Sequence, residues 1–272
     1  MSGNTSKFAD AFIEKMRSYS YTADLAQTDW AWEYLRRNPN YKAAYYESRT
    51  KPVRSITHAS GVKIYHDHGD NNQSVKWGLA MFSSPDINAL ESDIFWSHCT
   101  LTHRVCAVST CANPCLVSDL DLFRDKNCCA ILCRKKCQKA IIRSQSSTVD
   151  MQVAGVNILF QPVQLQFQID GFATINEDIK ALIGMRNALK SMRSGDKKPL
   201  TETTKLYRKK CLIALVCVQQ GGSLRDTAFV FQALNLTRLS WSTSGDEALK
   251  KQVWRCRNMG LKLMQGGYRK LL

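Results

Sequence analysis

The stretch GDEALKKQVWRCRNMGLKLM, residues 245–264, places apolar side chains three and four positions apart, with cations between them. This spacing predicts an amphipathic helix whose apolar stripe packs inward while its Lys and Arg side chains face solvent. The stripe we expect to be buried is Leu249, Val253, Cys256, Leu261 and Met264. The cations we expect on the same helix are Lys250, Lys251, Arg255, Arg257 and Lys262.

The residues before this helix predict further helices. INEDIKALIGMRNALKSMR repeats apolar residues at helical spacing and ends near Ser194. Thr201 then opens a helix that Gly221 and Gly222 close, and Ser223 caps a shorter one with Asp226 in the capping-box position. The order of these elements matches the layout of a helix-turn-helix unit: a helix, a Gly-Gly turn, a short helix, a loop and a basic helix. We therefore expect a helix-turn-helix DNA-binding domain over residues 176–272.

The net charge of the chain is +15, and residues 181–272 carry most of it. This part has ten Lys and eight Arg against five acidic residues, a net charge of +13. A general need for solubility spreads charge along a chain, whereas a domain that meets nucleic-acid phosphates concentrates it. We therefore expect double-stranded DNA as the partner. The alternative for each cation taken singly is a solvated helix face.

The N-terminal residues predict a small helical unit over residues 1–50. SKFADAFIEKM has its apolar residues on one helix face, and a second helix is expected to begin at Thr28 or Asp29 and to stop at Asn38-Pro39. A short third helix is expected from Tyr41 to Glu47. Residues 51–115 are expected to form a linker and a small apolar unit, with a strand in GVKIYH.

The middle of the chain predicts strands over residues 116–175. PVQLQFQIDG alternates apolar residues with Gln in period two, and SQSSTVDMQVAGVNILF precedes it as a second strand-rich stretch. NCCAILCRKKCQKAIIR fits a helix or two strands, and we favour strands. A short antiparallel sheet between helical units gives an α+β fold class.

Two stretches resemble known families. The C-terminal part from about Val163, most of all its ending GLKLMQGGYRKLL, resembles the DNA-binding domain of proteobacterial regulators of integrative and conjugative elements. DWAWEYLRRNPNYKAAY, with WGLAMF and IFW further on, resembles the transcriptional-regulator-like domain that often precedes it. The resemblance implies a sequence-specific transcription factor, commonly an activator or antiactivator of excision and transfer genes. Gly266, Gly267, Tyr268 and Arg269 match its signature and are expected to be structural.

The signature of the N-terminal unit leaves two interpretations open. Its residues are Trp30, Trp32, Tyr34, Arg36 and Arg37. Trp and Arg are enriched at binding hot spots, and in the first interpretation these side chains form a second nucleic-acid contact or a surface for a partner such as another transcription regulator or RNA polymerase. The alternative, which we favour, is a small helical core with the aromatic rings packed under the Arg stems.

Two further sets of residues are weighed in the same way. Ser242, Thr243 and Ser244 precede the basic helix, and Ser244 is our candidate for a phosphate contact at the helix N-terminus, with an ordinary N-cap as the alternative. His98, Cys99, His103, Cys106, Cys111 and Cys115 lie close together, but no CxxC pair occurs. We therefore expect buried or inert thiols, with no metal and no cofactor.

The sequence favours a regulator over an enzyme. No P-loop, GxSxG, HExxH or dinucleotide motif occurs, and we expect no catalytic residue. Eleven Cys, no secretory pattern and no long uncharged apolar stretch predict a cytoplasmic protein without a membrane partner. The rival hypothesis is an antiactivator that binds another regulator through the same fold. The oligomeric state stays open.

Overall fold

Local capping chemistry determines where the N-terminal helices begin. In α2 (Gln27–Leu35) the N-cap is Ala26, whose backbone N–H donates to Oδ2 of Asp29 at 2.9 Å. The expected start at Thr28 or Asp29 is therefore too late, because the carboxylate caps this helix from its third position.

The computed structural model describes residues 12–48, 55–66, 73–101, 105–113, 118–122, 128–143, 148–169, 171–194, 200–239 and 247–272.

The pair Asn38-Pro39 starts a helix as well as ending one. The Asn38 side chain accepts hydrogen bonds from the backbone of Asn40 and Tyr41, and Pro39 occupies the first position of α3 (Pro39–Glu47). Proline suits that position because its missing N–H has no partner there in any helix. The third helix thus begins two residues before the expected Tyr41. The 3₁₀ helix η1 (Ser18–Asp24) precedes α2.

Strands from both expected middle units form one sheet. Within the described residues it has seven strands in the order β1-β2-β4-β5-β6-β3-β7. Their bounds are β1 (Ser55–Thr57), β2 (Lys63–His66), β3 (Val105–Cys111), β4 (Cys128–Cys133), β5 (Gln138–Arg143), β6 (Thr148–Gly155) and β7 (Val163–Gln168). The α+β class is confirmed, and the ambiguous segment NCCAILCRKKCQKAIIR is two strands, as favoured.

The sheet is larger than expected and is mixed. We expected a short antiparallel sheet over residues 116–175, but β1, β2 and β3 come from the preceding segment. The pairs β2–β4 and β3–β6 are parallel, whereas the other four pairs are antiparallel. Parallel pairing joins strands that are distant in sequence, so the period-two pattern of one strand does not reveal it.

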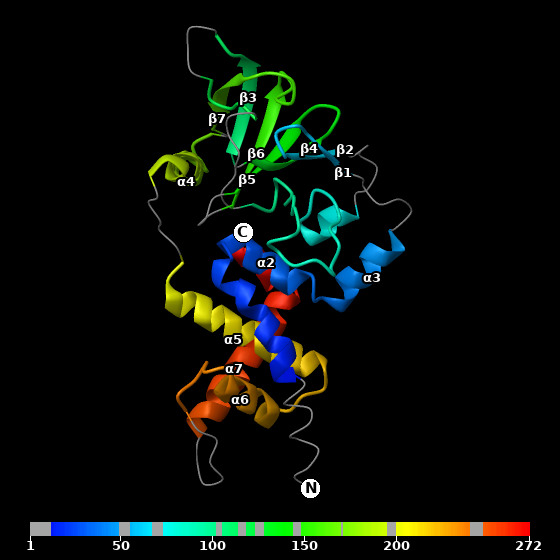
Figure 1. The fold of residues 1–272 in the computed structure, drawn as a ribbon, viewed down its shortest axis with the longest axis vertical. Coiled ribbons are helices and arrows are strands. Elements are labelled where there is room, and N and C mark those ends of the chain that lie inside the picture. Colours follow the sequence, from blue (N-terminus) through cyan, green and yellow to red (C-terminus); the bar gives the residue numbers. More distant parts are fainter. Residues whose placement is uncertain are drawn as a thin grey trace.

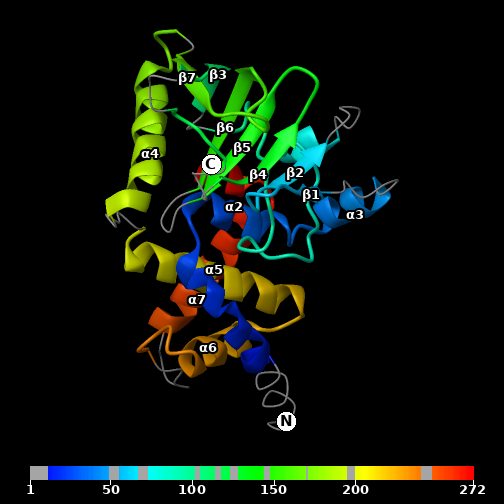
Figure 2. The same cartoon turned by 45° about the horizontal axis from the view of Figure 1, so that its top comes forward.

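Both faces of the sheet are covered. α4 (Ile175–Ser194) packs Ala181 and Met185 against one face, and Figure 2 shows this helix beside β7. The segment 73–101, which includes η2 (Ser74–Trp77) and the β-bridge between Leu79 and Trp96, covers the other face. The sheet is therefore a layer between α4 and this segment.

The C-terminal helices follow the predicted caps. They are α5 (Glu202–Gln219), α6 (Leu224–Ala233), α7 (Glu247–Met264) and the 3₁₀ helix η3 (Gly267–Leu271). Thr201 caps α5, and Ser223 with Asp226 forms the capping box of α6. Gly221 ends α5 with φ +81°, a left-handed conformation that glycine adopts without strain.

The N-terminal and C-terminal helices share one hydrophobic core. Trp30 and Trp32 of α2 belong to the same buried cluster as Leu212 of α5 and Val253 of α7. Figure 1 places the sheet at one end of the molecule and α5, α6 and α7 at the other, with α2 between them. The boundaries expected between residues 1–50, 51–115, 116–175 and 176–272 stay a prediction. No described helix has the length and apolar character needed to span a membrane.

Candidate nucleic-acid interface

α7 buries one face and exposes most of its cations. The buried residues are Leu249, Val253, Cys256, Gly260, Leu263 and Met264. Leu261, which we expected in this stripe, is only partly buried, and Gly260 and Leu263 lie in the stripe instead. Lys250, Lys251, Arg255 and Lys262 are exposed, whereas Arg257 is partly buried. Ser244 lies outside the described residues, as do Ser242 and Thr243.

The exposed cations divide between two sides of α7. Arg255 follows Lys251 by four residues and Lys262 follows Arg255 by seven, so these three share one side. Lys250 and Arg257 are seven residues apart and lie on a second side. The expected set of DNA-binding residues is therefore not a single row, and the first side is the more exposed.

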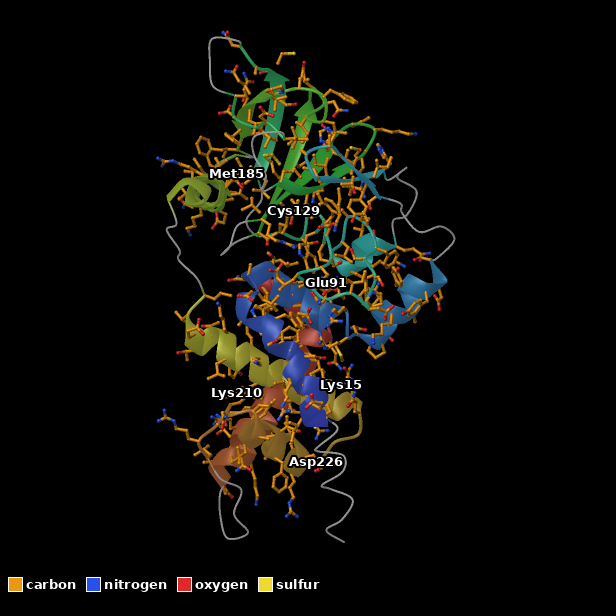
Figure 3. All side chains as sticks on the ribbon, in the orientation of Figure 1. Lys15, Glu91, Cys129, Met185, Lys210 and Asp226 are labelled. Atoms are coloured by element: carbon orange, nitrogen blue, oxygen red, sulfur yellow. The ribbon has the colours of Figure 1, made fainter. Side chains whose placement is uncertain are left out.

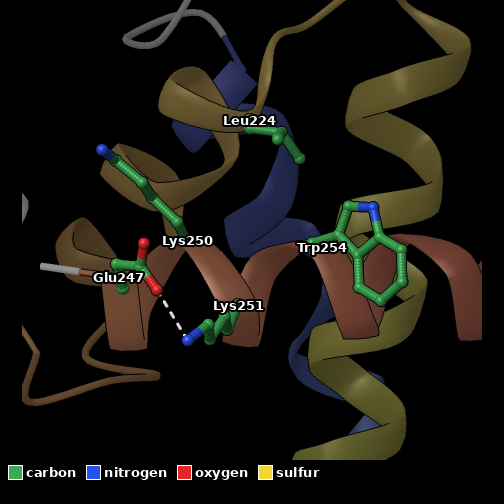
Figure 4. A pocket seen from close by; sticks show the side chains of 5 residues that line it. All are labelled: Leu224, Glu247, Lys250, Lys251 and Trp254. Atoms are coloured by element: carbon green, nitrogen blue, oxygen red, sulfur yellow. Dashed lines mark ion pairs between the residues drawn. The ribbon is translucent and has the colours of Figure 1, made fainter.

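An ion pair holds one of these cations. Nζ of Lys251 lies 2.6 Å from Oε2 of Glu247, one helical turn earlier (Figure 4). The hydrogen bond from Lys251, together with its charge, lowers the pKa of Glu247. Both side chains are well exposed, so solvent screens the pair and a competing anion can replace Glu247 at little cost.

A shallow pocket lies next to this ion pair. Leu224 of α6 and Glu247, Lys250, Lys251 and Trp254 of α7 line a volume of about 240 Å³ (Figure 4). The Trp254 indole is 56% exposed, unusual for a Trp side chain. An aromatic ring is thus presented to solvent between the two sides of α7 that carry cations.

The first half of α5 adds a basic stretch that the sequence patterns did not indicate. Lys210 interacts electrostatically with Cys211 and with Cys256 of α7, so its ammonium lies close to the crossing of the two helices. Tyr207 is also at this crossing. Burial, followed by interaction with Cys211, raises the pKa of Tyr207 to about 12, and the charge of Arg255 acts in the opposite direction. Lys210 and Arg255 therefore approach the same region from two helices.

These contacts define a basic surface, made of Lys210 on α5 and Lys251, Arg255 and Lys262 on α7. Figure 3 shows Lys210 on α5, in the helical end of the molecule, and Met185 of α4 in the sheet end. The only signal in the sequence for Lys210 is the run Arg208 to Lys210. Such a run predicts charge, but the fold is needed to place it beside α7.

The C-terminal signature residues fix the end of the chain. Gly266 has φ +126°, and a Cβ on Gly267 would lie 2.7 Å from the carbonyl oxygen of Lys262. The buried Tyr268 donates its hydroxyl to the carbonyl oxygen of Trp77 at 2.9 Å, and Arg269 donates to that of Lys76. These contacts tie η3 to η2.

Two of the N-terminal signature residues, Arg36 and Arg37, pair with the buried carboxylate of Glu33. Oε2 of Glu33 accepts from Arg36 at 2.9 Å, Arg37 at 2.6 Å and the Tyr21 hydroxyl at 2.7 Å. Burial acts to raise the pKa of Glu33, but the charges of Arg37 and Arg36 lower it below its usual value. Trp30, Trp32 and Arg37 are themselves buried, so a single chain does not offer them to a partner on its surface.

The Cys and His residues that lie close together in the sequence are only partly described. Sγ of Cys106 lies 3.4 Å from Nε2 of His98, and Cys111 accepts a hydrogen bond from Gln161. His103 and Cys115 lie outside the described residues. Among those described, no three His, Cys, Asp or Glu side chains are grouped as a metal ion requires.

Two family models match the chain. Residues 172–272, which include α4, α5, α6 and α7, match a family described as T6SS, Transcription factor, DNA binding domain. Residues 14–80 match the Proteobacterial transcriptional regulator-like domain. No curated protein and no solved structure matches the chain.

The two matches confirm the domain arrangement that the resemblance implied. The match to a transcriptional-regulator-like domain lies in the N-terminal part, and the match to a transcription-factor DNA-binding domain lies in the C-terminal part, which contains the basic surface. This is the domain composition of a DNA-binding transcriptional regulator. Neither family is described as an enzyme family.

Proposed function

We propose that the protein is a sequence-specific regulator of transcription that binds double-stranded DNA through the basic surface. The observation that carries the proposal is the position of this surface. Lys210, Lys251, Arg255 and Lys262 come from two packed helices within the residues that match a DNA-binding family. Clustered cations of this kind neutralise phosphates.

The dimensions of α7 suit a duplex. Lys251 and Lys262 are eleven residues apart, which is about 16 Å along a helix axis. This distance corresponds to roughly five steps of 3.4 Å along a DNA strand. The cations at the two ends thus reach different phosphates, while Arg255 and Trp254 between them face the groove.

The helix-turn-helix interpretation belongs to this proposal. Residues 220–223 join α5 to α6, and a turn of that length is typical of the motif. Residues 234–246 separate α6 from α7, a longer connection. In that motif the reading helix directly follows the turn and would here be α6. We assign the role to α7 instead, because its exposed side carries more cations than the short α6.

The proposal also concerns which genes the protein regulates. The resemblance implies excision and transfer genes of an integrative or conjugative element, whereas the matched C-terminal family is described with the term T6SS. A genome-wide footprint of the bound protein separates the two. Sites upstream of excision and transfer genes support the first assignment, and sites elsewhere refute it.

The rival is an antiactivator that binds another regulator through the same fold. A protein-binding surface has no need for a net charge of +13 over residues 181–272, which favours DNA as the partner.

The test that separates DNA binding from the rival is a fluorescence anisotropy titration of a labelled duplex with the full chain. Four phosphate contacts predict binding about a hundredfold weaker at 200 mM than at about 50 mM salt. No binding at low salt, or binding that is insensitive to salt, supports the rival.

A further inference from the structure

A thiol and an imidazole meet on the face of the sheet that the segment 73–101 covers. Cys106 lies on β3, and its Sγ is 3.4 Å from Nε2 and 3.9 Å from Nδ1 of His98. Both residues are partly exposed, so a small reagent can reach them. An imidazole at this distance can accept the thiol proton, and the resulting thiolate is the nucleophilic form of cysteine.

A buried lysine lies on the same face. The register pairs Cys106 with Gln152 and Gln152 with Lys139, so the three side chains point to one side of the sheet. Lys139 is 4% exposed, donates to the carbonyl oxygen of Trp96 and interacts electrostatically with Cys106. Burial lowers the pKa of Lys139, while the carboxylate of Asp150 opposes this effect. A cation here favours a thiolate at Cys106.

Several other thiols in the described residues lie in less favourable surroundings, whereas Cys137 is partly exposed and also interacts electrostatically with Lys139. Burial raises the pKa of Cys129 and of Cys133, which disfavours their thiolates. Cys211 and Cys256 are buried in the helical core, out of reach of reagents. Cys99 and Cys111 are exposed and serve as internal standards for labelling, and Cys111 also accepts a hydrogen bond from Gln161.

We propose that Cys106 is a peroxide-reactive thiol whose proton is taken by His98. Nε2 of His98 accepts the proton from Sγ, and the thiolate attacks one oxygen of hydrogen peroxide. An S–O bond forms as the O–O bond breaks, and the proton on His98 passes to the departing hydroxide to give water. The sulfur loses two electrons and becomes a sulfenic acid, while the peroxide is reduced to water.

The experiment treats the full chain with equimolar hydrogen peroxide at pH 6.5, in the presence of a 1,3-dione that traps sulfenic acids. Peptide mass mapping then gives the labelling rate of each cysteine. A thiol with the ordinary pKa of about 8.5 is only about 1% thiolate at this pH. We expect Cys106 to be labelled at least about tenfold faster than Cys99 or Cys111. Equal rates at the three sites would overturn the proposal.

Two controls separate the role of His98 from a change in fold. His98→Ala is expected to slow labelling of Cys106 by about tenfold, whereas His66→Ala, at an exposed histidine at the end of β2, leaves the rate unchanged. Unchanged labelling of a folded His98→Ala chain refutes the proposal. If that variant does not fold, the parent is labelled between pH 6.5 and 8. If the labelling rate of Cys106 increases less than about threefold over this range, the result supports a thiolate formed by proton transfer to His98. An increase of roughly twentyfold, as expected of an ordinary thiol, refutes the proposal.

Discussion

Gly260 of α7 lies against the backbone of Cys211 of α5, so closely that a Cβ on Gly260 would stand 2.5 Å from the Cys211 carbonyl oxygen. The second nearest atom, Cβ of Leu215, would be 3.0 Å away. Since the first of these neighbours is backbone, it cannot move aside without displacing the whole helix. The close approach of α5 and α7 therefore depends on glycine at this position, and the basic surface spans both helices.

Gly260→Ala is expected to destabilise the fold. The added methyl group separates α7 from α5, and overpacking of this kind costs about 1 to 3 kcal/mol, more than the gain of up to about 1 kcal/mol in helix propensity. Urea unfolding measures the change. The matched control is Gly184→Ala in α4, where a Cβ meets nothing within 4 Å. That control is expected to be neutral or stabilising, and equal effects of the two substitutions would contradict the close packing.

Glu33→Gln is expected to cost about 3 to 5 kcal/mol of the free energy of unfolding. The substitution removes the carboxylate that pairs with Arg36 and Arg37 and leaves the buried Arg37 guanidinium without a counter-charge. Glu14→Gln is the control, because the pair of Glu14 with Arg17 is exposed and worth under about 1 kcal/mol. A loss below about 1 kcal/mol for Glu33→Gln would show that the buried cluster contributes little.

Asp150 on β6 is expected to make stability fall as the pH rises from about 4 to 6. Its side chain is buried and faces Lys139, Asp29 of α2 and Arg143. Burial raises the pKa of Asp150 to about 6, with Lys139 acting in the opposite direction. The folded chain therefore binds this proton more tightly than the unfolded chain, whose Asp pKa is about 3.9. The stabilisation is fully present below pH 4 and is lost as the pH passes 6.

Asp150→Asn isolates this effect, because amide and protonated carboxyl have nearly the same shape. Urea unfolding at pH 4.5 and at pH 7 should show the parent losing about 2 kcal/mol relative to the variant at the higher pH. Asp24→Asn, at an exposed position in η1, is the control, and its free energy of unfolding should change with pH in the same way as that of the parent. The same pH response in parent and Asp150→Asn would mean that Asp150 does not retain its proton in the folded chain.

The helical boundaries near the C-terminus could be predicted because local chemistry sets them. The Thr201 cap, the Ser223 and Asp226 capping box and the left-handed Gly221 all act within one helical turn of the residues they cap. The apolar spacing of α7 likewise sets its buried face, apart from Leu261.

The sheet could be predicted only in part. β3 reads VCAVSTC, and its inward and outward positions differ little in polarity because Val and Cys lie on both. No period-two pattern is visible there, although the residues alternate in burial. Its parallel pairing with β6 joins Val105 to Met151, a contact that no local rule specifies.

The basic surface could be predicted for α7 alone. Lys251, Arg255 and Lys262 share a helix side by their spacing, which the sequence displays. Lys210 joins them only because α5 crosses α7 at Gly260, and that crossing is a tertiary contact. The ion pair of Lys251 with Glu247 follows an ordinary spacing of four residues.

The most direct test of the central claim compares Arg255→Ala with two cation controls on duplex DNA. If Arg255 contacts a base edge, its loss should cost about 1 to 3 kcal/mol on specific DNA and relax sequence preference. If it contacts a phosphate, all sequences should weaken alike and the salt slope should fall by about one unit. Lys251→Ala is expected to behave in one of the same two ways.

Both controls remove a cation outside the basic surface. Lys180→Ala, exposed on α4, should leave DNA binding and the melting temperature unchanged. Arg269→Ala should lower the melting temperature, because it removes the contact with Lys76, and should leave DNA binding close to that of the parent. We expect weaker DNA binding for folded Arg255→Ala and Lys251→Ala than for either control. Parent-like affinity of both folded variants on specific and scrambled duplexes would contradict it.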